Sequence, residues 1–159
     1  SLYGVSDNAI VAAMKRIKPL SHRLEFISCF DSIKFYNDSK STNINSTIKA
    51  LESFNENIVL ILGGVSKGAD FSELKSNLKA VKNIYCYGKS GQEIANSLKS
   101  DIHVKYLDDF SDCVKEAIGS AVQYDNVLLS PACASFDQFN NFEERGELFR
   151  KIVMERSNV

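Results

Sequence analysis

The sequence predicts an α/β domain of the Rossmann-like, three-layer type, with a mostly parallel sheet of about six strands and helices on both faces. The first observation behind this prediction is a hydrophobic content of 44% over 159 residues, which is enough for one continuous core. The second is the alternation of helical patterns with short β-rich runs, which occupy residues 24–29, 33–36, 58–62, 84–87, 103–106 and 127–129.

A short amphipathic pattern at the start of the chain stands apart from this alternation. Ile10, Met14 and Ile17 share one face of a helix expected over residues 8–17, and Pro19 ends it. We therefore expect residues 1–20 to form a lead-in segment and residues 21–159 to form the main domain.

The first two β-rich runs differ from the others in their spacing. Only Phe30, Asp31 and Ser32 separate them, which is too short for a crossover helix, so the sequence predicts an antiparallel hairpin at one edge of the sheet. The run Ile-Val-Leu-Ile-Leu at 58–62 is apolar on both faces, which predicts a central strand.

Helices are indicated by caps and by apolar periodicity. Ser90 with Glu93 predicts a capping box, and Asp70 with Glu73 predicts a weaker one. Two apolar stripes predict further helices, and they consist of Ile44, Ile48, Leu51 and Phe54, and of Phe110, Val114, Ala117, Ile118 and Ala121.

Composition argues against several functions. Nineteen basic and 20 acidic residues give a net charge of −1 without blocks of like charge, so we expect no nucleic acid and no membrane as partners. No apolar run reaches the roughly 20 residues that span a bilayer, and no leader pattern precedes the first helix, so we expect a cytoplasmic protein. The four cysteines form no Cys-x-x-Cys pair and do not cluster with the two histidines, so we expect reduced thiols and no metal site.

Three polar loops follow predicted strands, and ligands of such sheets bind beyond the carboxyl ends of the strands. The first loop covers residues 37–43. Asp38 and Lys40 could serve a metal-bound phosphate and its charge, and Thr42 could donate to a carboxylate. A solvated loop with a helix cap is the alternative interpretation.

The second loop covers residues 63–70. Its paired glycines, Gly63 and Gly64, allow the backbone to approach a ligand closely, and Lys67 adds a positive charge at the rim. The spacing of a Walker A phosphate loop is absent. A plain turn with an incidental lysine is the alternative here.

The third loop, residues 130–135, runs into an aromatic-rich stretch. Ser135 is surrounded by small residues that leave room for a ligand. Neither Ser135 nor Cys133 is predicted to be a nucleophile, because His22 and His103 are both expected outside the ligand-side loops. Together the three loops suit a small dianionic or zwitterionic ligand, such as a dicarboxylic amino acid.

These loops, with Glu143, Arg145 and Gly146 after the third, resemble the muramyl ligase family, and most closely the carboxyl-terminal domain of its D-glutamate-adding members. The resemblance starts at His22 and extends to about Val153, with the motifs in the family's order. It implies an ATP-dependent amide ligase of peptidoglycan assembly. In that reaction ATP phosphorylates the carboxylate of UDP-MurNAc-L-alanine, Mg²⁺ offsets phosphate charge, and the D-glutamate amine attacks the acyl phosphate.

The resemblance also implies roles for individual residues. The positions that match D-glutamate ligands are Thr42, Lys67, Ser135 and the backbone at Phe142. The positions that match the nucleotide site are Arg23, Asp38 and Lys40, and the last two also match the reaction centre, so they are the expected catalytic residues.

The family's full enzyme has two more domains, one for the UDP-sugar and a central ATPase domain that makes most contacts with ATP and Mg²⁺. Residues 1–20 resemble the last helix of that central domain, which implies that residues 21–159 supply part of an active site, as a monomer, with no ligase activity alone. Two alternatives stay open. One is a stand-alone Rossmann-like module for a nucleotide or amino acid, although the Gly-x-Gly-x-x-Gly fingerprint is missing; the other is another amide ligase, such as the folylpolyglutamate type.

Overall fold

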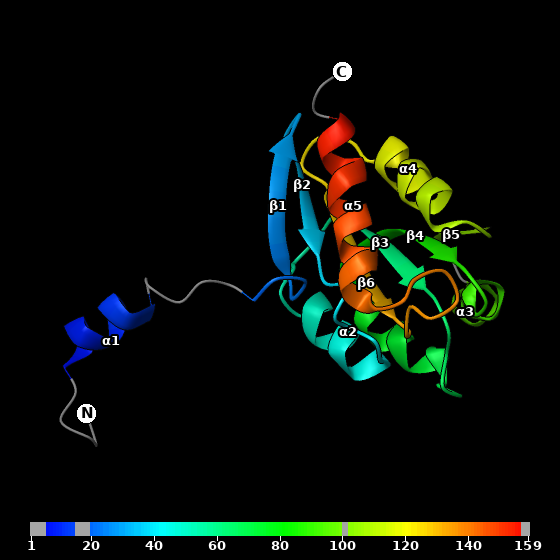
Figure 1. The fold of residues 1–159 in the computed structure, drawn as a ribbon, viewed down its shortest axis with the longest axis horizontal. Coiled ribbons are helices and arrows are strands. Elements are labelled where there is room, and N and C mark those ends of the chain that lie inside the picture. Colours follow the sequence, from blue (N-terminus) through cyan, green and yellow to red (C-terminus); the bar gives the residue numbers. More distant parts are fainter. Residues whose placement is uncertain (1–5, 15–19, 100–101, 157–159) are drawn as a thin grey trace.

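A computed structural model describes residues 6–14, 20–99 and 102–156. It shows a six-stranded sheet between two layers of helices (Figure 1). The strands are β1 (Glu25–Phe30), β2 (Ile33–Asn37), β3 (Ile58–Gly63), β4 (Val81–Tyr87), β5 (His103–Leu107) and β6 (Asn126–Ala132). The helices are α1 (Asp7–Met14), α2 (Ile44–Leu51), α3 (Gly91–Leu98), α4 (Phe110–Ser120), α5 (Phe142–Arg156) and the 3₁₀ helix η1 (Phe71–Ala80).

The strand order is β1-β2-β6-β3-β4-β5, and among these six described strands only β1 and β2 pair antiparallel. The predicted fold class, with its antiparallel edge strand, is therefore confirmed. β3 lies in the interior of the sheet and is buried along its whole length, as its apolar run predicted.

Two hydrophobic clusters, one on each face of the sheet, form the core. Side chains from α2, η1 and α3 pack on one face, and side chains from α4 and α5 pack on the other. The stripe predicted on α4 is buried in full, whereas on α2 the helix ends at Leu51 and Phe54 packs from the turn that follows.

The capping box predicted for Ser90 and Glu93 is wrong. Ser90 makes no side-chain cap hydrogen bond, and its Oγ instead accepts from the Ser66 N–H at 2.9 Å. Asp70 does cap η1, by accepting from the Ser72 N–H at 2.9 Å. A local pattern predicts the cap, but a loop distant in sequence competes for the same hydroxyl.

The boundary of the third loop also differs from the prediction. β6 continues through Ser130 and Pro131 to Ala132, with a register irregularity in its pairing with β3. Pro131 has no N–H to donate, and an irregularity of this kind lets a strand accommodate it. β2 likewise includes Asn37, which the sequence placed in the first loop.

The predicted lead-in helix is present as α1, Asp7–Met14, which lies apart from the sheet (Figure 1). Ile17 and Pro19 lie outside the described residues, as do the side chains of Ile10 and Met14. No helix in the described parts of the chain is long and apolar enough to cross a membrane. All four cysteines are free thiols, as predicted.

Candidate functional site

The three polar loops lie together because they follow three consecutive strands of the sheet, β2, β6 and β3. The loops after β3 and β6 are joined directly by backbone hydrogen bonds in both directions between Val65 and Ala134, at 2.8 and 3.1 Å. The predicted convergence at the carboxyl edge is thus present, although the strand order that produces it was not predicted from the sequence.

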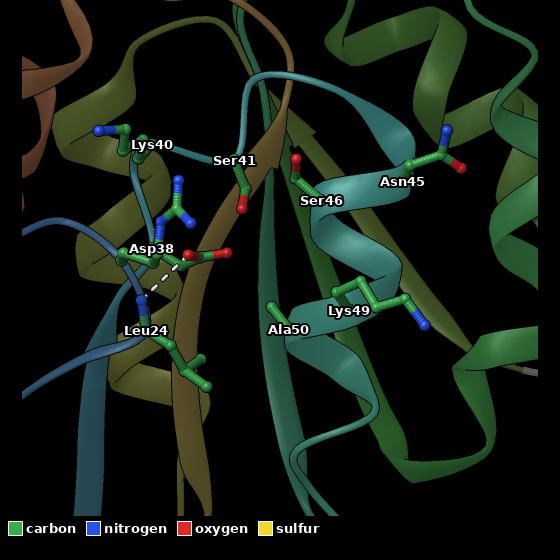
Figure 2. Close-up of a pocket in the computed structure, with 9 residues that line it drawn as sticks. Leu24, Asp38, Lys40, Ser41, Asn45, Ser46, Lys49 and Ala50 are labelled. Carbon is green, nitrogen blue, oxygen red and sulfur yellow. Dashed lines mark hydrogen bonds between the residues drawn. The ribbon is translucent and has the colours of Figure 1, made fainter. Parts of the chain in front are cut away.

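A pocket of about 420 Å³ opens beside the first loop. Leu24, Asp38 and Lys40 lie on one side of it, and residues of α2 lie on the other (Figure 2). Its lining consists of Arg23, Leu24, Asp38, Lys40, Ser41, Asn45, Ser46, Lys49 and Ala50. All three residues expected at the nucleotide, Arg23, Asp38 and Lys40, therefore share one pocket.

Asp38 is the only carboxylate among the lining residues, and it is 3% exposed. Its Oδ1 accepts from the Leu24 N–H at 3.0 Å, and its Oδ2 accepts from the Ser130 hydroxyl at 2.7 Å. Burial raises the pKa of Asp38 above its ordinary value, while these hydrogen bonds and the charge of Arg23 oppose that rise. The carboxylate is thus a fixed acceptor, held between the hairpin and β6.

Lys40 and Phe142 are brought together at the rim of the pocket. The Lys40 Nζ lies 5.5 Å from the centroid of the Phe142 ring, within the range of a cation–π contact. The Phe142 carbonyl accepts a hydrogen bond from the Ser39 hydroxyl at 2.7 Å. That hydrogen bond ties the start of α5 to the first loop.

The residues expected to hold D-glutamate lie in the converging loops but not in the lining of this pocket. Thr42 is half-buried in the first loop, and Lys67 is exposed in the second. Ser135 is 2% exposed, and its carbonyl accepts from the N–H groups of Gln138 and Phe139. The Val65–Ala134 pairing places the loops of Lys67 and Ser135 side by side.

Gly63 and Gly64 have a different role from the predicted one. Both have positive φ, and a Cβ on Gly63 would collide with the Tyr87 carbonyl, while one on Gly64 would collide with the Ala134 carbonyl. The close approach that these glycines allow is to the chain's own backbone, so the ligand-approach interpretation is corrected. Gly64 lets the second loop approach the third, and Gly63 lets the end of β3 approach Tyr87 at the end of β4.

His22 was expected outside the ligand-side loops, and this was wrong. β1 is antiparallel to β2, so the start of β1 lies beside the carboxyl end of β2, at the site. His22 is buried, its Nδ1 lies 2.9 Å from Asn37 Nδ2, and its ring contacts Phe142 edge to face at 6.1 Å. The antiparallel hairpin was itself predicted, and that topology could have located His22.

Arg145 is the main residue whose role sequence reasoning missed. Its side chain is fully buried and donates hydrogen bonds to Ser39, Tyr87 and Cys133. The available signal was helical spacing, because Arg145 lies four residues before buried Phe149 on the same face of α5.

The described residues contain no cluster of three or more His, Cys, Asp or Glu side chains that could hold a metal ion. The polar groups that line the pocket are instead one guanidinium, two ammonium groups, one carboxylate, two hydroxyls and one amide. Such a set can bind an anionic, hydroxyl-bearing ligand.

Known proteins match this chain in sequence. A family model described as "Mur ligase, glutamate ligase domain" matches residues 22–133. The chain is 43% identical over 156 residues to the UDP-N-acetylmuramoylalanine–D-glutamate ligase of Francisella philomiragia, covering 96% of this chain and 38% of the relative. It is 44% identical over 154 residues to the ligase of the same name from Pelotomaculum thermopropionicum, covering 95% of this chain and 34% of the relative.

Solved structures share the fold at lower identity. The UDP-N-acetylmuramate-alanine ligase from Thermotoga maritima matches with a TM-score of 0.67 at 14% identity, over 96% of this chain and 34% of the other. E. coli FolC in complex with DHPP and ADP matches with a TM-score of 0.65 at 19% identity, over 96% of this chain and 36% of the other. The chain thus spans somewhat more than a third of the length of the proteins that it matches.

Proposed function

Because this chain belongs to the Mur ligase, glutamate ligase domain family, we propose that it supplies the D-glutamate-binding domain of a longer ATP-dependent amide ligase. The acceptor in this proposal is UDP-N-acetylmuramoyl-L-alanine, as the names of the relatives at 43% and 44% identity suggest. The structural observation that carries the ATP-dependent part of the proposal is the convergence of Arg23, Asp38 and Lys40 on one pocket. The domain acts in the cytoplasm, where ATP is present, and as a monomer.

The pocket fits the phosphate side of a nucleotide. Arg23 and Lys40 are both exposed at its surface, so their charges are free to meet phosphate oxygens, and Asp38 is a fixed acceptor. ATP bound there supplies the phosphoryl group that activates a carboxylate. We assign no metal site to this chain, because its described residues offer no carboxylate or imidazole cluster.

D-Glutamate is assigned to the three converging loops. Lys67 is exposed and can pair with a ligand carboxylate, and Thr42 and Ser135 carry hydroxyls that can donate to the other. The Phe142 carbonyl accepts a hydrogen bond from Ser39, and its second lone pair leaves it able to accept another from the ligand. These residues orient the amino acid for attack, which is a contribution of position rather than of covalent chemistry.

An NMR titration of the chain with D-glutamate tests this assignment. We expect shifts of the amides in residues 39–43, 64–69 and 133–136, with a Kd of about 1 mM or weaker, which corresponds to roughly −4 kcal/mol. L-Glutamate serves as the matched ligand control. Shifts confined to other regions, or equal binding of both enantiomers, would contradict the assignment.

A phosphate-release assay tests the second half of the proposal. The chain alone, given ATP, D-glutamate and UDP-N-acetylmuramoyl-L-alanine, is expected to form no product, because the groups that bind each substrate come from more than one domain. Product formation by the chain alone would contradict the proposal that the substrate-binding groups come from more than one domain.

A further inference from the structure

Arg145 lies in the first turn of α5 and has 0% exposed surface. Its guanidinium makes four hydrogen bonds. Nε donates to the Ser39 hydroxyl at 2.9 Å and one terminal nitrogen donates to the Ser39 carbonyl at 2.7 Å. The other terminal nitrogen donates to the Tyr87 hydroxyl and to the Cys133 carbonyl, each at 3.1 Å.

This buried cation forms no salt bridge with any carboxylate in the described parts of the chain. Arg150, on the same helix, is different, since it pairs with the Glu25 carboxylate at 2.7 Å. An unpaired buried charge is costly, and fixed dipoles of carbonyls and hydroxyls must compensate for it. Apolar side chains of similar volume often replace buried charged groups without loss of stability, so the need to fill space does not by itself explain the guanidinium.

The four hydrogen bonds join elements that are far apart in the sequence. Ser39 belongs to the first loop, Cys133 to the third, and Tyr87 ends β4. Ser39 extends the connection, because its hydroxyl also donates to the Phe142 carbonyl. One side chain therefore contacts both the loop that carries Asp38 and Lys40 and the loop that carries Ser135.

We propose that Arg145 is a positioning residue that holds the first and third loops at a fixed separation, so that the nucleotide pocket and the D-glutamate contacts form together. This inference rests on the proposed function for the identity of the two ligands. The planar fork of arginine suits the task, because its five N–H donors are spread over three nitrogens of one rigid group, whereas the three donors of lysine share one nitrogen.

The inference predicts a specific defect in Arg145→Lys. The variant is expected to fold, but amide hydrogen exchange in residues 38–42 and 133–135 should accelerate about tenfold or more in both loops, because each loses a hydrogen bond worth roughly that factor. Arg156→Lys is the matched control. Arg156 lies on the same helix and donates to the Ile118 carbonyl at 2.7 Å, far from the loops, so both loops should keep their protection.

Ligand binding supplies the second readout. In Arg145→Lys, affinity for D-glutamate and for a non-hydrolysable ATP analogue should fall together, each by about tenfold, whereas a purely structural residue would lower the Tm without changing the affinity of the folded protein. If exchange accelerates in one loop only, or in neither, the inference is wrong. Loss of affinity for one ligand alone would also overturn it.

A third variant covers the case in which Arg145→Lys does not fold. Ser39→Ala keeps the cation and its bond to the Ser39 carbonyl but removes the links from Arg145 Nε and to the Phe142 carbonyl. It should accelerate exchange in the first loop and at Phe142, and unchanged exchange there contradicts the inference. Exchange is measured without ligand, so the two proposals are tested separately. A wild-type chain that binds neither ligand refutes the proposed function, whereas the exchange data alone decide whether Arg145 holds the two loops.

Discussion

The two ends of the sheet bury very different groups. Of the buried polar and charged side chains in the described residues, all but Asp125 lie at the carboxyl end of the parallel strands or contact it. Asp125 lies at the opposite end, where both of its carboxylate oxygens have partners. Lys82 Nζ lies 2.7 Å from its Oδ1, and the Val122 N–H donates to its Oδ2 at 3.0 Å.

This difference distinguishes the buried polar groups that stabilise the fold from those that belong to the candidate site. Among the described residues, the amino end of the parallel strands buries one charged side chain, Asp125, and that carboxylate has a cationic partner. The other end buries an unpaired arginine, a carboxylate and a histidine, each of which costs free energy unless it is compensated. Sites where a protein departs from the most stable choice are where function is expected. The following predictions test this contrast in order of decreasing effect.

The largest effect is expected from replacing a glycine by alanine at each end of the sheet, Gly146 at the site and Gly119 at the opposite end. In Gly146→Ala the new Cβ would collide with His22 Nδ1 and crowd Asn37 Nδ2, which are bonded to each other, so the free energy of unfolding should fall by about 3 kcal/mol. Gly119→Ala, in α4, meets no atom within 4 Å and should raise it by about 0.5 to 1 kcal/mol. Urea unfolding measures both. Similar effects of the two substitutions would contradict the expected difference between the two ends of the sheet.

The ion pair at the opposite end should matter for stability and not for binding. Asp125→Asn leaves Lys82 without its partner, but Lys82 is 40% exposed and can be hydrated, so we expect a loss of about 2 kcal/mol in the free energy of unfolding. Binding of D-glutamate should be unchanged in the same NMR titration. Altered D-glutamate affinity would mean that the two ends are coupled.

Substitution of Asp38 should have the opposite effect on stability, because burial disfavours the charge of this carboxylate. Its folded pKa lies above the ordinary value of 3.8, so the proton stabilises the folded state at acidic pH, and this contribution is lost as pH rises through the folded pKa. Asp38→Asn should therefore raise the free energy of unfolding at pH 7 by about 1 kcal/mol and leave it nearly unchanged at pH 3. Melting curves at both values check this. A variant that is less stable at pH 7 would show that hydrogen bonding outweighs burial at Asp38.

Lys67 should have the smallest effect on stability. It is exposed, so Lys67→Met should change the free energy of unfolding by less than about 0.5 kcal/mol while weakening D-glutamate binding about tenfold. Lys105→Met is the control. Lys105 lies outside the three loops, with a side chain that is 43% exposed and paired with Glu116, so its substitution should leave D-glutamate binding unchanged. Equal binding in both variants would remove Lys67 from the proposed site.

Much of the site could be predicted because its residues sit in local motifs. Asp38, Lys40 and Thr42 lie within five residues of one another after a strand, and a strand-to-helix loop is visible in one sequence window. Arg145 and Ser90 could not be interpreted in that way, because their partners lie up to 106 residues away. Hydrophobic periodicity located the elements, but it carries no information about which loops exchange hydrogen bonds.

The sequence alone determined the number of strands, the antiparallel edge hairpin, the buried central strand and the three polar loops, because each depends on the periodicity and spacing of neighbouring residues. The tertiary structure decided the order β2-β6-β3, which brings those loops together, and the burial of Arg145 among them. The physical reason is that a buried polar group is stabilised by whatever partners the fold brings within hydrogen-bond distance, and those partners come from anywhere in the chain.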